Sequence, residues 1–103
     1  MSPRFVLSPE AVEDLASIWN YIQQKSSAET ADRVESVIRE RVIFLARNPG
    51  AGHHRKDVTD RPVRFFPVYS YLIVYCLDTK PLQVVAIIHG RRDIGTELQN
   101  RPS

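Results

Sequence analysis

The first residues of the chain follow two different hydrophobic patterns. Residues 4–7 are a short run rich in aromatic and β-branched side chains, which predicts a strand that ends at Ser8 and Pro9. Ser8 is a suitable N-cap and Pro9 a suitable first helical residue, so a helix is predicted to begin at once. Its apolar residues recur every three or four positions up to about Gln24: Val12, Leu15, Ile18 or Trp19, and Ile22.

A second amphipathic helix is predicted to follow almost without a loop. Ser26, with Glu29 three residues later, matches the capping-box pattern. The apolar stripe of this helix is Ala31, Val34, Ile38, Val42 and Leu45. The Arg-Asn-Pro-Gly segment at 47–50 ends the helix, because proline has no N–H to donate. Two helices joined by so short a connection are expected to lie antiparallel, as a helical hairpin.

Three apolar runs follow a polar loop at residues 48–62. They are residues 63–68, 71–77 and 82–89. The link at 78–81 has the length and polarity of a hairpin connection. Pro67 predicts an edge position or a bend, because it removes a ladder hydrogen bond. The nearly continuous apolar run at 84–88 is typical of a central strand.

This order of elements predicts one α+β domain over residues 1–103. An N-terminal strand precedes an antiparallel helical hairpin, and a three-stranded antiparallel sheet follows. Residues 95–103 are polar, and we expect either a frayed turn or a segment that becomes ordered on a partner. A single hairpin covers one face of the sheet, so the other face, or the groove beside the hairpin, is expected to retain apolar surface.

Composition indicates a small cytoplasmic protein. The 103 residues carry a formal net charge of +2 and are 43% hydrophobic. No apolar run approaches the ~18–20 residues of a membrane span, and no signal peptide is recognisable. Cys76 has no partner for an intramolecular disulfide, and its apolar surroundings favour a packing role. Residues 53–92 hold seven basic and three acidic side chains, so the positive charge gathers in the second half of the chain.

Several kinds of chemistry are disfavoured by spacing. His53 and His54 are adjacent in a loop, and no Cys, Asp or Glu set completes a metal site around them. The Gly-containing segment at 49–52 follows a helix, whereas a phosphate-binding loop leads from a strand into one. Asp57 and Asp60 lie in a basic loop and do not resemble a hydrolytic pair. We therefore expect neither a metal nor a cofactor.

The informative segment is residues 89–93, at the end of the predicted central strand. Gly90 ends the regular run, and Arg91 and Arg92 then emerge side by side, where they could bind phosphates or an acidic partner. Arg64 begins a neighbouring strand and is expected to reach the same end of the sheet. The alternative is structural: Asp93 pairs with Arg64 or Arg92 and fixes the C-terminal edge.

Aromatic residues divide between packing and contact. Trp19 and Phe44 are expected to pack. Tyr69 and Tyr71 lie near a predicted turn, where they could stack on a ligand or partner. Pro49, which stops the second helix, is a further structural candidate, together with Trp19, Gly90 and Asp93.

Five segments, in their order and spacing, carry a family resemblance. They are Leu-Ser-Pro-Glu-Ala at 7–11, Asn-Pro-Gly at 48–50, Val-Arg-Phe-Phe-Pro-Val at 63–68, Ser-Tyr-Leu-Ile-Val-Tyr at 70–75, and Ile-His-Gly-Arg-Arg-Asp at 88–93. Over about residues 3–95 the chain resembles the ParE branch of the RelE/ParE superfamily, the toxins of type II toxin–antitoxin modules. The resemblance implies a growth inhibitor held inactive by a cognate ParD-like antitoxin, in a hetero-oligomer.

The two branches of this superfamily imply different activities. ParE-like members act on DNA gyrase and trap it with broken DNA. RelE-like members cleave mRNA in the ribosome, using basic residues on the sheet and a tyrosine near the C-terminus. By motif alignment, Pro67 and Leu72 stand where RelE-like enzymes carry basic side chains, and no tyrosine follows Tyr75. Arg92 matches a basic position of both branches.

Three functions follow as hypotheses. We favour a toxin that binds and poisons DNA gyrase and is not itself an enzyme. The second is a ribosome-dependent mRNA endonuclease with Arg64, His89 and Arg92 at the phosphate, and the third is a non-toxic remnant that only binds its antitoxin. The candidate surface for target or antitoxin is Arg64, Tyr69, Tyr71, His89, Arg91 and Arg92. Antitoxin residues that face these arginines are expected to be acidic, and we expect no membrane binding and no direct sequence-specific nucleic-acid binding.

Overall fold

The computed structural model describes residues 4–77 and 79–101. Its elements are β1 (Phe5–Leu7), α1 (Pro9–Lys25), α2 (Ala28–Arg47), the 3-10 turn η1 (Pro49–Ala51), β2 (Val63–Val68), β3 (Tyr71–Cys76), β4 (Leu82–His89) and α3 (Ile94–Gln99). The predicted order of strand, two helices and three strands is confirmed. The link between β3 and β4 is short as expected, although Asp78 lies outside the described residues.

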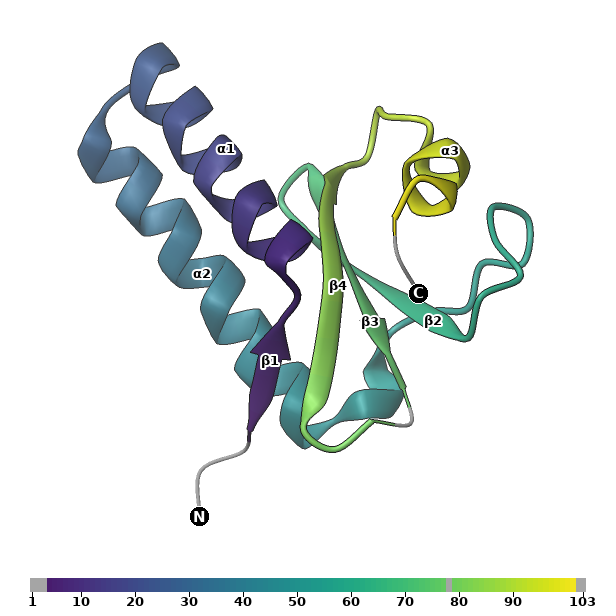
Figure 1. Ribbon diagram of the computed structural model, residues 1–103. Coiled ribbons are helices and arrows are strands. Elements are labelled where there is room, and N and C mark those ends of the chain that lie inside the picture. The colour runs from purple at the N-terminus through teal and green to yellow at the C-terminus, as the bar shows by residue number, and fades with distance from the viewer. Residues whose placement is uncertain (1–3, 78, 102–103) are drawn as a thin grey trace.

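The helical hairpin forms as its local signals predict, with one correction. Ser8 caps α1, and its hydroxyl accepts a hydrogen bond of 3.0 Å from the Ala11 N–H. The N-cap of α2 is Ser27, where we expected Ser26, and its hydroxyl accepts from the Thr30 N–H at 3.1 Å. Ser26 is the C-cap of α1, because its own N–H donates to the Ile22 carbonyl at 2.7 Å. The two helices run antiparallel (Figure 1).

The four strands form one sheet in the order β1-β4-β3-β2. β2, β3 and β4 are antiparallel neighbours, and β1 adds to β4 in parallel. β4 is therefore central, as its continuous apolar run predicted. Pro67 lies on the edge strand β2, where one side of the backbone needs no ladder partner.

Two apolar clusters pack on opposite faces of the sheet, because successive side chains of a strand alternate between faces. On the hairpin side, Leu15 and Ile38 of the helices pack with Ile73, Tyr75 and Ile87 of the sheet. Every member of that group is less than 5% exposed. Figure 1 shows the hairpin on one side of the sheet and α3 on the other.

The second face of the sheet is covered, which corrects the expected tail and the first of the two places where we expected apolar surface. Residues 94–99 form helix α3, whereas we expected a frayed turn or a partner-dependent segment. Ile94 and Leu98 of this helix pack on Phe65, Val74 and other residues of the second face. This face therefore keeps little of the open apolar surface that one hairpin would leave. Pro102 and Ser103, the end of the expected tail, lie outside the described residues.

The loop between α2 and β2 is more structured than its composition suggested. It begins with η1, and His53 then forms an antiparallel bridge with Phe65 through two backbone hydrogen bonds of 2.8 and 2.9 Å.

Among the described residues, no helix combines the length and apolar character needed to cross a membrane.

Candidate functional site

β1 pairs only with the first three residues of β4. The last paired residues are Leu7 and Val84, and a register shift follows at Val85. Beyond this point, side chains of α1 bind the edge of β4. The Ser8 hydroxyl donates to the Val85 carbonyl at 3.1 Å, and Asp14 Oδ2 accepts from the Ile87 N–H at 2.9 Å. Helix α1 therefore replaces the missing strand along this edge.

Asp14 also joins α1 to the C-terminal end of the chain. Its Oδ1 lies 2.9 Å from a guanidinium nitrogen of Arg101, and only 19% and 13% of the two side chains are exposed. The carbonyl of Arg101 in turn accepts a hydrogen bond of 2.9 Å from Arg61. A partly buried, hydrogen-bonded ion pair of this kind is held more firmly than an exposed one. The C-terminal segment is thus fixed against α1 and the loop before β2.

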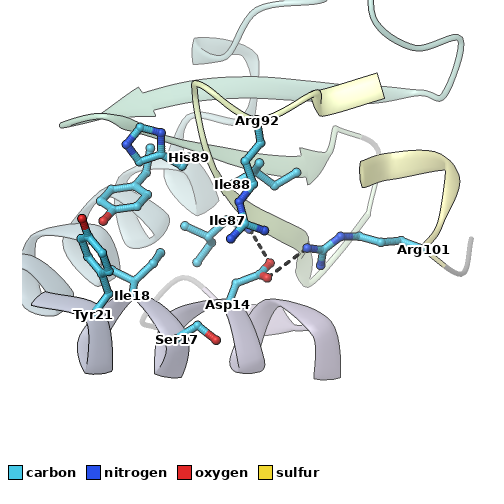
Figure 2. Close-up of a pocket in the computed structure, with 10 residues that line it drawn as sticks. Asp14, Ser17, Ile18, Tyr21, Ile87, Ile88, His89, Arg92 and Arg101 are labelled. Atoms are coloured by element: carbon cyan, nitrogen blue, oxygen red, sulfur yellow. Dashed lines mark hydrogen bonds and ion pairs between the residues drawn. The ribbon is translucent and has the colours of Figure 1, made fainter. Parts of the chain in front are cut away.

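A pocket of about 510 Å³ lies between α1, β4 and this segment. We call it the α1–β4 pocket. Its apolar lining comes from Ile18, Ile87 and Ile88, and its polar lining from Asp14, Ser17, Tyr21, Tyr71, His89, Arg92 and Arg101. Figure 2 shows Asp14 and Arg101 facing each other at one end, Tyr21 and His89 at the other, and Arg92 reaching in between.

Tyr71 and His89 form the aromatic end of the pocket. They are register partners on β3 and β4, and their rings meet edge to face with centroids 5.3 Å apart. Burial raises the pKa of the Tyr71 hydroxyl, and the neighbouring Tyr21 raises it further. His89 Nδ1 accepts a hydrogen bond of 3.1 Å from the Arg91 N–H. In the neutral imidazole this assigns the ring proton to Nε2, so His89 can act as a donor there.

Arg91 and Arg92 have different surroundings. Arg92 lines the pocket and forms an ion pair of 3.0 Å with Glu97 of α3, although 65% of its side chain is exposed. Arg91 is exposed and does not contribute to the pocket lining. Of the adjacent arginines, therefore, one faces a built pocket and the other faces solvent.

Arg64 lies at the opposite end of the sheet, contrary to our expectation. It pairs in register with Tyr75, which pairs with Val84, whereas His89 lies five residues further along β4. At ~3.3 Å per strand residue, this offset is about 16 Å. A guanidinium nitrogen of Arg64 donates to the Gly52 carbonyl at 2.9 Å. β2 and β4 are both antiparallel to β3 and therefore run in the same direction, so the first residues of β2 lie at the end of the sheet where β4 starts. Arg64 supports the loop after η1 there.

Comparison with known proteins identifies the fold and the family. A family model described as the ParE toxin of the type II toxin–antitoxin system parDE matches residues 5–94. The chain belongs to the ParE toxin family. A solved chain from the chromosomal ParDE TA system of P. aeruginosa has a similar fold, with a TM-score of 0.70 at 22% sequence identity. The similarity covers 85% of this chain and 96% of that one. The search of curated proteins gave no match.

The family match ends at Ile94, the first residue of α3. The rest of α3 and Arg101, the partner of Asp14, therefore lie outside the matched segment.

Within this ParE family member, Asp93 is the N-cap of α3. Its Oδ1 accepts from the Thr96 N–H at 3.2 Å, and its Oδ2 accepts from the Thr96 hydroxyl at 2.9 Å. These two bonds lower the pKa of Asp93. The structural alternative paired Asp93 with Arg64 or Arg92, but its carboxylate caps α3 instead.

The other structural candidates have identifiable contacts. Trp19 Nε1 donates to Asp32 at 2.8 Å, which ties α1 to α2. The Pro49 carbonyl accepts a hydrogen bond from the Tyr75 hydroxyl. The Gly90 N–H donates to the Ser70 carbonyl at 2.8 Å, and a Cβ at this position would lie 3.3 Å from that oxygen. Gly90 thus allows a close approach of two backbones.

Tyr69 stands apart from the α1–β4 pocket. It occupies the turn between β2 and β3 with a positive φ of 54°, and 62% of it is exposed. Of the predicted contact residues, the structure gathers Tyr71, His89 and Arg92 in the pocket. It leaves Tyr69 and Arg91 outside the lining and Arg64 at the far end of the sheet.

The sequence analysis missed four of the seven polar lining residues: Asp14, Ser17, Tyr21 and Arg101. Asp14, Ser17 and Tyr21 lie on α1. Their spacing of three and four residues places them along one side of a helix, which is the signal that could have found them. Arg101 lies in the segment that we expected to be a tail, so nothing local indicated its contact with Asp14.

No cluster of three or more His, Cys, Asp or Glu side chains suited to a metal ion occurs within residues 4–77 and 79–101. Cys76 is partly buried beside the second apolar cluster, and this burial raises the pKa of its thiol. A raised pKa keeps the thiol protonated and poorly nucleophilic near neutral pH.

Proposed function

We propose that this ParE family member inhibits bacterial growth by binding and poisoning DNA gyrase in the cytoplasm, and that a cognate ParD-like antitoxin neutralises it in a hetero-oligomer. The toxin class rests on the family match over residues 5–94. The gyrase target rests on the resemblance to the ParE branch. One geometric observation supports binding over RNA cleavage: Arg64 is remote from His89 and Arg92.

General acid–base catalysis needs its groups within hydrogen-bond reach of the same reacting centre, about 2.6–3.2 Å between heavy atoms. The offset of about 16 Å along the sheet keeps Arg64 away from a phosphate held by His89 and Arg92. Arg64 is also engaged with the Gly52 carbonyl. The endonuclease hypothesis therefore loses one of its three residues and retains only the pair at the pocket.

A cleavage-complex assay tests the target. Purified protein is incubated with gyrase, ATP and supercoiled plasmid, and the reaction is stopped with detergent and digested with protease. We expect linear DNA to increase with the dose of protein and to be absent without gyrase. Unchanged gyrase together with cut ribosome-bound mRNA would contradict the proposal and favour the endonuclease.

A growth assay tests the toxin and antitoxin parts separately. We expect induction of this chain alone to stop bacterial growth. Where the adjacent reading frame encodes a small protein, we expect its co-expression to restore growth. Harmless expression of a folded protein would indicate the non-toxic remnant. Toxicity that the adjacent protein does not relieve would show that this protein is not the antitoxin.

A further inference from the structure

Two guanidiniums of the α1–β4 pocket share one carboxylate of the same chain. Arg92 lies 3.0 Å from Glu97 Oε1, and Arg101 lies 3.8 Å from Glu97 Oε2. Both arginines line the pocket, whereas Glu97 sits beside it on α3 and is not part of the lining. The pocket thus has two cations directed at a carboxylate that comes from the short helix next to it.

The two arginines differ in how freely they can exchange that carboxylate. The Arg101 side chain is only 13% exposed and also binds Asp14 at 2.9 Å, so it is held in place. The Arg92 side chain is 65% exposed, and exposed ion pairs contribute little net energy. Arg92 also has five N–H donors, of which Glu97 engages one. Arg92 is therefore the cation that can accept a carboxylate from outside.

Neutral donors surround Arg92. No hydrogen bond within the described residues uses the hydroxyls of Ser17, Tyr21 or Tyr71, and His89 has its Nε2–H remaining once Nδ1 has accepted from Arg91. Figure 2 places Tyr21, His89 and Arg92 around the same space. Since Asp14 is already bound by Arg101 and by the Ile87 N–H, the remaining capacity of the pocket is for an acceptor.

The charges favour one carboxylate on an apolar peptide over a nucleic acid. Arg92 and Arg101 are balanced by Asp14 and Glu97, so the pocket has no excess of positive charge. A polyanionic backbone binds mainly through a surplus of Lys and Arg. The rest of the lining is three isoleucines, two tyrosines, Ser17 and His89, which suits an acidic side chain with apolar neighbours.

We propose that the α1–β4 pocket binds an acidic side chain of the antitoxin, with Arg92 as the cation that receives it and Glu97 as the internal competitor. The proposal rests on the proposed function, since it names the chemistry of the partner at this site.

The contact is made by a side chain and not by an added strand. An added strand would need the backbone groups along the free edge of β4, but Asp14 occupies the Ile87 N–H and Ser8 binds the Val85 carbonyl. Asp14 is itself fixed by Arg101. The partner therefore presents its carboxylate across the edge and does not extend the sheet there.

Two variants with opposite expected effects test the competition. The purified protein of the adjacent reading frame is titrated into the wild type, R92Q, E97Q and the matched control R91Q. We expect R92Q to weaken binding at least tenfold, because it removes charge-assisted hydrogen bonds. We expect E97Q to tighten binding about two- to fivefold, since the lost competitor is an exposed ion pair. R91Q, which changes the neighbouring charge outside the pocket, should bind like the wild type.

The outcomes separate this inference from the proposed function. If the adjacent protein binds the wild type and R92Q equally, or if E97Q does not tighten binding, the pocket proposal is overturned while the toxin–antitoxin assignment stands. Loss of binding through misfolding cannot imitate the result, because E97Q is expected to gain affinity. A short single-stranded RNA that binds more tightly than the adjacent protein and depends on Arg92 would also overturn the proposal, in favour of a nucleic-acid site.

A partner-independent probe tests the pocket if the adjacent protein does not bind. N-acetylglutamate α-amide, which has a single carboxylate, is titrated into labelled protein and followed by NMR. We expect saturable shifts of the Arg92 Nε–H and the His89 ring in the wild type and larger shifts in E97Q. In R92Q, where the His89 ring is the remaining reporter, we expect no shift of that ring. Shifts that equal those caused by the same concentration of sodium chloride would refute a carboxylate site.

Discussion

Removal of the Tyr75 hydroxyl tests how the core supports the loop after α2. Tyr75 is fully buried, and its hydroxyl accepts a hydrogen bond of 2.8 Å from the Gly52 N–H and donates to the Pro49 carbonyl. Tyr75→Phe keeps the ring in the core but leaves both backbone groups without this partner. Gly52 is buried, so its N–H cannot turn to water, whereas Pro49 is partly exposed.

The expected cost follows from these two groups. A buried donor left unsatisfied costs about 1–3 kcal/mol, and the Pro49 carbonyl adds little because solvent can reach it. We therefore expect the free energy of unfolding to fall by about 2 kcal/mol. Urea denaturation followed by circular dichroism should show a midpoint lower by roughly 1–2 M, and the melting temperature should drop by roughly 8–16 °C.

Tyr69→Phe is the matched control, because it removes the same atom from a residue that is 62% exposed. We expect its midpoint to equal that of the wild type. A Tyr75→Phe protein as stable as the wild type would refute the view that this hydroxyl anchors the loop. Equal losses in both variants would show that the effect is not specific to burial.

The same variant predicts a difference in alkaline solution. Burial raises the pKa of Tyr75 in the folded protein, although the Gly52 N–H offsets part of the rise. Above about pH 10 the unfolded chain loses this proton while the folded chain retains it, so stability falls as pH rises. We expect the wild type to lose stability more steeply than Tyr75→Phe through this range. Parallel curves for the two proteins would contradict the assigned burial effect.

Three further predictions concern other elements. Leu98→Ala removes a side chain that is 1% exposed and should lower the free energy of unfolding by about 2 kcal/mol, as measured by urea denaturation. An unchanged midpoint would mean that α3 does not stabilise the fold. Cys76 should react with iodoacetamide much more slowly in the folded than in the unfolded protein near neutral pH, as mass spectrometry can follow, and equal rates would contradict its burial. Trp19→Phe loses the exposed bond to Asp32 and should cost no more than about 1 kcal/mol in the same denaturation assay, so a larger loss would point to packing instead.

Most of the secondary structure could be predicted because its causes are local. Ser8 caps α1 through an atom three residues away, and the apolar stripes of both helices repeat within single turns. Pro67 indicated an edge strand because its ring leaves no backbone N–H to donate to a neighbouring strand. Even the error at Ser26 was local, because two adjacent serines offer the same cap chemistry and the end of α1 decides between them.

The candidate site was predictable only where one strand carries it. His89 ends β4 and Arg92 follows three residues later, so their place at the same end of the sheet needed no further information. Arg64 required the strand direction as well, and the sequence does not state which ends of neighbouring strands meet. Tyr21 required knowledge of which side of α1 faces β4.

The sequence by itself determined the two helices of the hairpin, the strands, their order and the family resemblance, because these depend on neighbours within a few residues. Only the tertiary structure decided that Asp14 binds Arg101 across 87 positions and that α3 covers the second face of the sheet. Such contacts depend on packing between distant segments, which leaves no periodic trace in either segment. The α1–β4 pocket exists because the fold brings these segments together.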